Sequence, residues 1–338
     1  EGFMGSYNPP GGFKSVHFAV CTIEKANSLI NHFLQEGTLS EIGAVVIDEM
    51  HLLGEPNRGY ILELLLTKLK YVSLKDSTVD VQIIGMSATL PNLQTLSKWL
   101  DAELYVTNFR PIPLHELASV AGDIYDSNFK LVRKIAPLPD LDTDTDHILQ
   151  LCLETIKDNC SVLIFCPTKN WCENLAQQIS AAFCKLGRGT SQIGVDLRSQ
   201  LNSERICELL EQLKRCPVGL DPVLCRTASF GVAFHHAGLT LDERDIVEGA
   251  FRGGVVRVLV ATSTLSSGVN LPARRVIIRT PVFHGKALDA LVYRQMMGRA
   301  GRMGKDACGE SILVCQKHEE KHARGLMTEA LRPVESCL

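Results

Sequence analysis

Along residues 16–104, short apolar runs alternate with amphipathic helical patterns. The runs at 16–20, 44–47 and 81–86 have the length and hydrophobicity of buried strands. Such alternation of strands and helices predicts a parallel sheet with helices on its faces.

A second block of the same kind follows residue 147. Its strand-like runs are 161–165, 255–260 and 275–278. One helix between them has clear predicted ends, because Thr240 and Glu243 have the spacing of a capping box and Gly253-Gly254 supplies a left-handed stop.

The pattern weakens between the two blocks, over residues 108–147, where prolines and an acidic stretch at 140–146 occur. We therefore predict a domain junction there. The polar stretch 185–226 predicts helices with a flexible excursion near 187–189. No solenoid-type repeat is found, but two α/β blocks in tandem predict two domains.

The chain has 338 residues, of which 45% are hydrophobic and 22% are charged, the composition of a soluble globular protein with about two domains. No apolar run approaches the roughly 18 residues that a membrane-spanning helix needs, so a membrane protein is not expected. The formal net charge of −3 gives no overall basic signature. Any nucleic acid must therefore be held by a local groove.

The 12 cysteines include no C-x-x-C pair, which predicts reduced thiols in a nuclear or cytosolic protein. The chain opens at Glu1, without an initiator methionine or a signal-like apolar stretch. We therefore expect a partial sequence whose natural start is missing.

The strongest chemical feature is the segment Asp48-Glu49-Met50-His51, directly after the apolar run at 44–47. Phosphoryl transfer needs carboxylates at the end of a strand. Asp48 can hold Mg²⁺ through its water shell, and Glu49 can orient and deprotonate the attacking water. For this segment taken alone, an acidic turn after a core strand is an equal alternative.

Two further segments follow in order. Ser87-Ala88-Thr89 comes directly after the third apolar run, and residues 293–302 contain Gln295, Arg299 and Arg302. If this last segment is helical, the three side chains share one face. Two guanidinium groups would stabilise the charge on a transferred γ-phosphate, an effect worth about 10³- to 10⁵-fold in rate. A solvated basic helix is the alternative.

Taken together and in this order, the segments resemble the motifs of superfamily 2 helicases. Asp48-Glu49-Met50-His51 resembles motif II, Ser87-Ala88-Thr89 resembles motif III, and Gln295 to Arg302 resembles motif VI. Residues 21–27 resemble the early nucleic-acid-contacting motif, 165–168 motif IV and 261–273 motif V.

Closer similarity is carried by residues 58–66, 234–239 and 268–275, which resemble the helicase regions of the polymerase theta type and its stand-alone helicase relative. The resemblance covers nearly the whole chain. It implies an α/β fold of two tandem RecA-like domains with parallel sheets. The implied parts are a partial first helicase domain at 1–108, a C-terminal helicase domain at 109–325 and the start of a winged-helix domain at 326–338.

The same resemblance implies an ATP-dependent 3′ to 5′ DNA helicase or translocase of DNA repair in the nucleus, joined to other domains of a parent chain. ATP and Mg²⁺ would be its cofactors, and DNA that is single-stranded or carries a single-stranded tail its partner. The residues assigned to the nucleotide are Asp48, Glu49, Gly268, Asn270, Arg299 and Arg302. The residues assigned to catalysis are Asp48, Glu49, His51, Gln295, Arg299 and Arg302, and Asp48 and Glu49 would hold Mg²⁺ through water. Coupling is assigned to Ser87 and Thr89, with His51 and Gln295.

Hydroxyl-bearing residues that follow apolar strands predict contacts with a phosphate backbone. They are Thr22, Thr168, Thr262, Ser263 and Thr264, to which the resemblance adds Arg58 and His236. For each hydroxyl taken alone, a helix N-cap is an equal alternative. Metal binding at His235-His236 is not expected, because adjacent histidines face different ways and no third ligand has suitable spacing.

One element of the family is not found in the chain. Motors of this class bind ATP phosphates with G-x-x-x-x-G-K-[ST], but Gly285-Lys286 and Gly304-Lys305 are followed by Ala287 and Asp306. We therefore expect a first domain truncated at its N-terminus and a chain that does not hydrolyse ATP by itself. Two alternatives stay open: a non-hydrolysing nucleic-acid-binding fragment, and an RNA helicase of the same branch.

Overall fold

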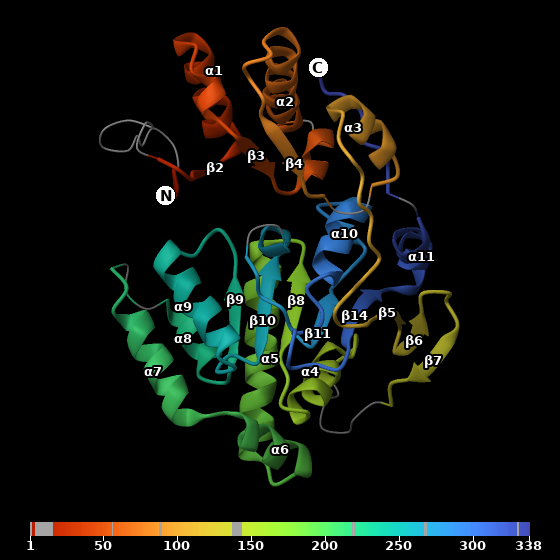
Figure 1. Cartoon of the computed structure of the whole chain (residues 1–338). Coiled ribbons are helices and arrows are strands. Elements are labelled where there is room, and N and C mark those ends of the chain that lie inside the picture. The colour runs from red at the N-terminus through yellow and green to blue at the C-terminus, as the bar shows by residue number, and fades with distance from the viewer. Residues whose placement is uncertain are drawn as a thin grey trace. The chain divides into compact units, whose positions relative to one another are not determined.

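The chain is an α/β protein that divides into two compact units, Glu1–Asn108 with Ala330–Leu338, and Phe109–Glu329 (Figure 1). The computed structural model describes residues 16–55, 57–87, 90–136, 144–217, 219, 221–266, 269–329 and 331–338, together with the backbone of 2–3. Within these residues, no helix combines the length and the apolar character that crossing a membrane requires.

The first unit contains two small parallel sheets, one of β1 and β2 and one of β3 and β4. Its elements are β1 Gly2–Phe3, β2 Val20–Cys21, α1 Ile23–Glu36, β3 Ala44–Ile47, α2 Gly59–Lys75, β4 Gln82–Gly85 and α3 Leu93–Leu100, with 3-10 turns η2 Leu39–Glu41 and η3 Met50–Gly54. The strands predicted at 44–47 and 81–86 are confirmed, and the run at 16–20 forms a strand only from Val20.

The core of the first unit is made mainly by one face of α2. The leucines of that face are spaced three and four residues apart, which is the period of a helix stripe. They are Leu62, Leu65, Leu66 and Leu69, and they pack in one buried cluster with Ile30 of α1 and Ile47 of β3. The carboxyl end of β3 is thereby fixed against the helices.

The last eight residues of the chain pack on this same unit. The side chain of Asn92 donates to the carbonyl of Val334 at 2.8 Å and accepts from its N–H at 3.0 Å. Glu63 on α2 accepts from the Ser336 hydroxyl at 2.6 Å and from the Cys337 N–H at 2.8 Å. The tail therefore belongs to the first unit, although the preceding helix belongs to the second.

The second unit is built on an eight-stranded sheet with the order β7-β6-β5-β14-β11-β8-β10-β9. Neighbours are parallel from β5 to β9, and β6 and β7 extend the sheet in antiparallel fashion. The strands are β5 Leu114–Val120, β6 Asp123–Asp126, β7 Leu131–Lys134, β8 Val162–Cys166, β9 Val232–His235, β10 Val258–Thr262, β11 Arg275–Ile278 and β14 Gly309–Cys315, with a separate hairpin of β12 Val282–Phe283 and β13 Lys286–Ala287.

The strands predicted at 161–165 and 275–278 are confirmed as β8 and β11, and the run at 255–260 forms a strand only from Val258, in β10. The stretch that the sequence marks only as a junction instead contains β5, β6 and β7. β5 pairs over its seven residues with β14, a strand from the far end of the chain. No local pattern can reveal such a distant partner.

The helices of the second unit are α4 Ile148–Lys157, α5 Lys169–Arg188, α6 Gln192–Gln200, α7 Ser203–Lys214, α8 Pro222–Ala228, α9 Leu241–Arg252, α10 Ala290–Met297 and α11 Glu320–Thr328. The predicted capping box of α9 is present, and Gly254 has the expected positive φ of 73°. The flexible excursion predicted near 187–189 is wrong. α5 runs through Arg188, and Arg198 of α6 donates to the carbonyls of Gly187 and Gly189.

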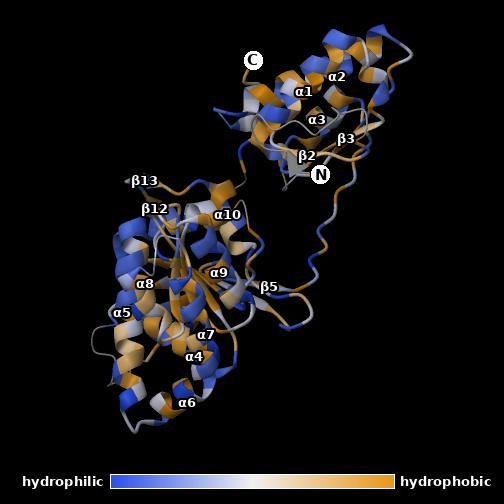
Figure 2. Cartoon of the chain, turned by 90° about the vertical axis from the view of Figure 1, so that its left-hand side faces the viewer, coloured by the Kyte–Doolittle hydropathy of each residue, from blue (hydrophilic) through white to orange (hydrophobic). Residues whose placement is uncertain are grey.

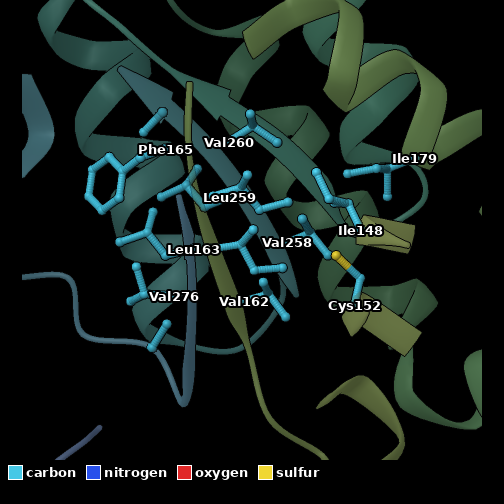
Figure 3. Close-up of a cluster of buried hydrophobic side chains, with 14 of the residues drawn as sticks. Ile148, Cys152, Val162, Leu163, Phe165, Ile179, Val258, Leu259, Val260 and Val276 are labelled. Carbon is cyan, nitrogen blue, oxygen red and sulfur yellow. The ribbon is translucent and has the colours of Figure 1, made fainter. Parts of the chain in front are cut away.

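The interior of the second unit is built on apolar side chains of the central strands. β8, β10 and β11 are buried almost throughout, and side chains of α4 and α5 pack among theirs (Figure 3). Colouring by hydropathy shows the same arrangement, with hydrophobic residues along the central strands and hydrophilic ones on the helices outside (Figure 2). This core holds the strands in place and so fixes the positions of the residues at their ends.

Candidate nucleotide and nucleic-acid sites

The two adjacent carboxylates lie where β3 ends. Asp48 is exposed, and its Oδ1 accepts a hydrogen bond of 2.9 Å from the N–H of Glu49. Glu49 has a φ of 54°, so the chain turns sharply away from the strand at this residue. The N–H of Met50 then donates to the carbonyl of Met86 at 2.8 Å, which ties the turn to the end of β4. The sheet thus presents both carboxylates at one edge.

His51 lies directly behind this turn. Its side chain is 1% exposed, and Nδ1 is 3.3 Å from Oε2 of Glu49, whose side chain is 46% exposed. The imidazole therefore connects the exposed carboxylate with the interior of the unit. Among the described residues, no group of three or more His, Cys, Asp or Glu side chains could hold a metal ion by itself.

Met50 fills a space left by a glycine of the neighbouring strand. Met50 is buried, and a Cβ on Gly85 would lie 2.4 Å from its sulfur. The side chain thus points into the protein and leaves the edge to the carboxylates. Ser87, two residues beyond β4, is exposed, and Thr89 lies outside the described residues.

Thr22 and Arg58 of the first unit lie close to one glutamate. The Thr22 hydroxyl accepts from the Lys25 N–H at 3.4 Å and so caps α1. Arg58 holds Glu24, on the first turn of α1, with contacts of 2.8 Å and 3.3 Å. Hydrogen bonding to Arg58 keeps the pKa of Glu24 below its ordinary value. The structure therefore brings these two predicted nucleic-acid contacts together.

The predicted hydroxyl contacts of the second unit gather at the carboxyl ends of β8 and β10. Thr262 is opposite Cys166 in the sheet, two residues before Thr168. Thr168 caps α5 by accepting from the Trp171 N–H at 3.3 Å. The hydroxyls of Thr262 and Thr264 are 2.9 Å apart.

Beyond Thr262, a 3-10 turn, η5 Ser263–Ser266, contains Ser263 and Thr264. Capping and phosphate binding are compatible, because a cap occupies one lone pair of the hydroxyl.

His236 is placed differently from the expectation. It is 3% exposed, and its Nδ1 accepts from the Gly238 N–H at 3.1 Å. That nitrogen is therefore unprotonated, so Nε2 carries the proton and donates to Glu173 at 3.0 Å. Burial lowers the pKa of His236, consistent with a neutral ring. A buried ring with both nitrogens engaged is at odds with direct contact to nucleic acid.

The segment that contains the two arginines is helical only in part. Gln295 lies in α10, but the helix ends at Met297, so the shared helix face predicted for Arg299 and Arg302 is wrong. The chain after α10 instead pairs with the approach to β11: Ala273 donates to the carbonyl of Arg299 at 3.0 Å. Competition from this pairing stops the helix.

Arg299 and Arg110 meet at this turn. Arg299 donates to the carbonyl of Ser266, the last residue of η5. Arg110 donates to the carbonyls of Gly298 and Ala300, on either side of Arg299, at 3.3 Å and 2.9 Å. Arg110 thus holds the main chain that carries Arg299, a role that no sequence motif indicates.

Arg302 lies near the amino ends of β8 and β14. Its guanidinium donates to both carboxylate oxygens of Asp306 at 2.9 Å and 2.8 Å, and to the sulfur of Cys160 at 3.3 Å. The side chain of Asp306 is only 2% exposed and that of Arg302 20%. Hydrogen bonds to Asp306 raise the pKa of Arg302, so the pair is fully ionised.

Two family models account for much of the chain. Residues 10–96 match the DEAD/DEAH box helicase model, and residues 201–304 match the helicase conserved C-terminal domain. The chain belongs to the DEAD/DEAH box helicases. Residues 309–338 also match a helix-turn-helix domain model.

The chain is similar to proteins that are much longer. It is 53% identical to DNA polymerase theta of Drosophila melanogaster and 55% identical to that of Mus musculus, covering all of this chain but 17% and 14% of those proteins. It is 35% identical to the ATP-dependent DNA helicase Hel308 of Pyrobaculum calidifontis, over 89% of this chain and 40% of that one. The chain thus spans less than a fifth of the two polymerase theta relatives.

Two residues assigned to the nucleotide lie in the segment after η5. Gly268 lies outside the described residues, and Asn270 is exposed beyond η5. No sequence motif identifies Trp171 and Arg279, although the guanidinium of Arg279 lies over the Trp171 ring. Nothing local marks them, because Arg279 reaches the tryptophan only through the pairing of β11 with β8.

Proposed function

We propose that this chain is part of an ATP-dependent 3′ to 5′ DNA helicase or translocase that acts in DNA repair in the nucleus and is built on two RecA-like domains. The observation that supports it most directly is the turn after β3, where an exposed Asp48 and a half-exposed Glu49 stand at a strand end in a DEAD/DEAH box helicase. The names of its relatives, DNA polymerase theta and ATP-dependent DNA helicase, point in the same direction.

The turn suits ATP and Mg²⁺. Mg²⁺ keeps several of its waters and binds through one or two carboxylates and the phosphates of the nucleotide. Asp48 is exposed and can hold the ion through that water shell. Glu49 would orient and deprotonate the attacking water, and His51 would transmit the state of Glu49 to the interior of the unit.

The second unit would supply the positive charge. Arg299 and Arg302 are proposed to stabilise the charge that develops on the γ-phosphate, and Gly268 and Asn270 to contact the nucleotide, with Gln295 coupling the two units. For Arg302, this role requires exchange of the Asp306 carboxylate for phosphate.

The nucleic acid is proposed to follow the hydroxyl groups at the strand ends. Those contacts are Thr22 and Arg58 in the first unit and Thr168, Thr262, Ser263 and Thr264 in the second. They read the phosphate backbone and no base sequence. DNA is favoured over RNA by the names of the relatives alone, so competition between matched DNA and RNA strands belongs to the test.

The test is DNA-stimulated ATP hydrolysis by the full-length protein. We expect Glu49→Gln to lower turnover by about 10²- to 10⁴-fold, the usual contribution of a general base. Arg299→Ala should lower turnover as well, whereas Glu41→Gln, at an exposed glutamate of the same unit, serves as the control. Undiminished turnover in both the Glu49 and the Arg299 variants would contradict the assigned roles.

A further inference from the structure

A large aromatic side chain stands exposed beside the hydroxyls of the second unit. Trp171, on the first turn of α5, is 47% exposed. Its N–H donates to the Thr168 hydroxyl at 3.3 Å, so the position of the tryptophan is fixed relative to a proposed phosphate contact. Lys169, between them, is also exposed.

A cation lies over the tryptophan ring. The guanidinium carbon of Arg279 is 5.6 Å from the ring centroid, within the range of a cation–π interaction. Arg279 follows β11 directly, and its N–H donates to the carbonyl of Phe165 in β8 at 3.0 Å. Its side chain is also paired with Asp146, so both ends of the arginine are held.

These groups form a row along one edge of the sheet. β11, β8 and β10 are neighbours in that order, and Arg279, Thr168 and Thr262 stand at their carboxyl ends. A backbone that follows the hydroxyls from β10 to β8 therefore runs toward the tryptophan and its cation. Exposed rings beside positive charge are how proteins stack single-stranded bases without reading sequence.

We propose that Trp171 and Arg279 form a stacking site for one base of a bound single strand, next to the backbone contact at Thr168. The proposal rests on the proposed nucleic-acid function. The indole supplies a flat surface, and Arg279 adds positive charge for the adjoining phosphate. The ion pair with Asp146 holds the guanidinium in place and offsets part of its charge, so the indole surface is the main contributor to the site.

The chain offers a direct optical test, because it has only two tryptophans. Trp99 packs against the core of the first unit, so Trp99→Phe leaves Trp171 as the single reporter. In this background, titration with a short oligothymidylate should quench the emission and saturate together with binding measured by anisotropy of a labelled strand. An oligonucleotide with abasic sites keeps the phosphates and should bind with little quenching.

Affinity gives an independent readout. Trp171→Leu should weaken binding of the single strand roughly 5- to 100-fold, the value of one stacked base. Trp171→Phe should recover most of the loss, and Arg279→Gln should weaken binding and flatten its salt dependence. Tyr105→Leu, at an 87% exposed tyrosine, is the matched control and should bind normally. Circular dichroism confirms that each variant is folded.

Three outcomes would contradict the proposal, and they distinguish failure of the stacking site from failure of nucleic-acid binding. If the strand binds but Trp171 emission and the affinity of Trp171→Leu do not change, the stacking site is overturned while nucleic-acid binding stands. Equal quenching by the abasic strand also overturns it, since the ring then senses phosphate. If no single strand binds at low salt, the nucleic-acid function proposed for the chain fails, and the stacking site fails with it.

Discussion

The ion pair of Arg302 and Asp306 gives the sharpest prediction about stability. Arg302→Ala removes two side-chain donors from a carboxylate that is 2% exposed. Breaking a buried pair by removing one partner costs about 3–5 kcal/mol, because a charge stays buried without compensation. The N–H of residue 302 still donates to Asp306 at 2.8 Å, so we expect the lower end, about 3 kcal/mol.

The pH dependence of this loss follows from the pKa of Asp306. Burial by itself would raise that pKa, but the hydrogen bonds and charge of Arg302, with the charge of Arg274, bring it below its ordinary value. A carboxyl whose folded pKa is depressed stabilises the fold above its unfolded pKa of about 4, and the contribution is lost as pH falls through the folded pKa. In the variant, burial acts on Asp306 without Arg302, so its carboxyl takes up a proton at a higher pH than in the wild type, and the gap between wild type and variant should be widest at neutral pH and narrow as pH falls.

Urea unfolding of the 338-residue chain measures this gap. The emission of Trp171 in the Trp99→Phe background reports on the second unit alone, which matters because two units can unfold separately. Lys214→Ala is the control: Lys214 and Glu211 form an exposed pair with 54% and 56% exposed side chains. Its loss should cost less than about 0.5 kcal/mol.

Unchanged urea stability of Arg302→Ala at pH 7 would refute this reasoning. In that case Asp306 does not depend on the arginine, and Arg302 is available for a phosphate. A loss of about 3 kcal/mol that persists undiminished at pH 3 would refute the electrostatic part, because protonated Asp306 needs no cation.

Two further predictions concern residues that support the site. Arg110→Ala should lower ATP turnover of the full-length protein by about 10- to 100-fold through misplacement of Arg299, with single-strand affinity unchanged in an anisotropy assay and Arg110→Lys only partly active. Gly85→Ala should destabilise the first unit by about 1–3 kcal/mol in urea unfolding. In the Met50→Ala background the same change should cost less, and strict additivity would show that the two side chains do not collide.

The secondary structure that could be predicted from the sequence is the part decided by local patterns. β3, β8 and β11 are continuous apolar runs, and the capping box of α9 lies within four residues of chain. β5 was not predicted in this way, since it follows prolines and its full length of seven residues pairs with β14, a strand from the far end of the chain. The end of α10 depends likewise on pairing with Ala273.

The residues of the candidate site likewise divide into those placed by their local sequence and those placed by distant partners. The carboxylates after β3 are placed by their own strand, so the sequence was sufficient to put Asp48 and Glu49 at the sheet edge. His236 was assigned to nucleic acid by its neighbours in the sequence, but Glu173, which holds it, comes from α5. Whether a polar side chain can contact nucleic acid therefore depends on partners that are distant in the chain.

The two arginines after α10 show how much this matters for chemistry. Arg299 donates to the main-chain carbonyl of Ser266, a neutral acceptor, whereas Arg302 donates to the buried carboxylate of Asp306. Hydrogen bonds between ionised partners are roughly twice as strong as neutral ones. A phosphate oxygen that binds Arg299 therefore competes with this carbonyl. At Arg302 a phosphate oxygen must displace the carboxylate of Asp306, whose negative charge would remain buried. Binding of a nucleotide phosphate therefore costs more free energy at Arg302 than the exchange of a neutral carbonyl does.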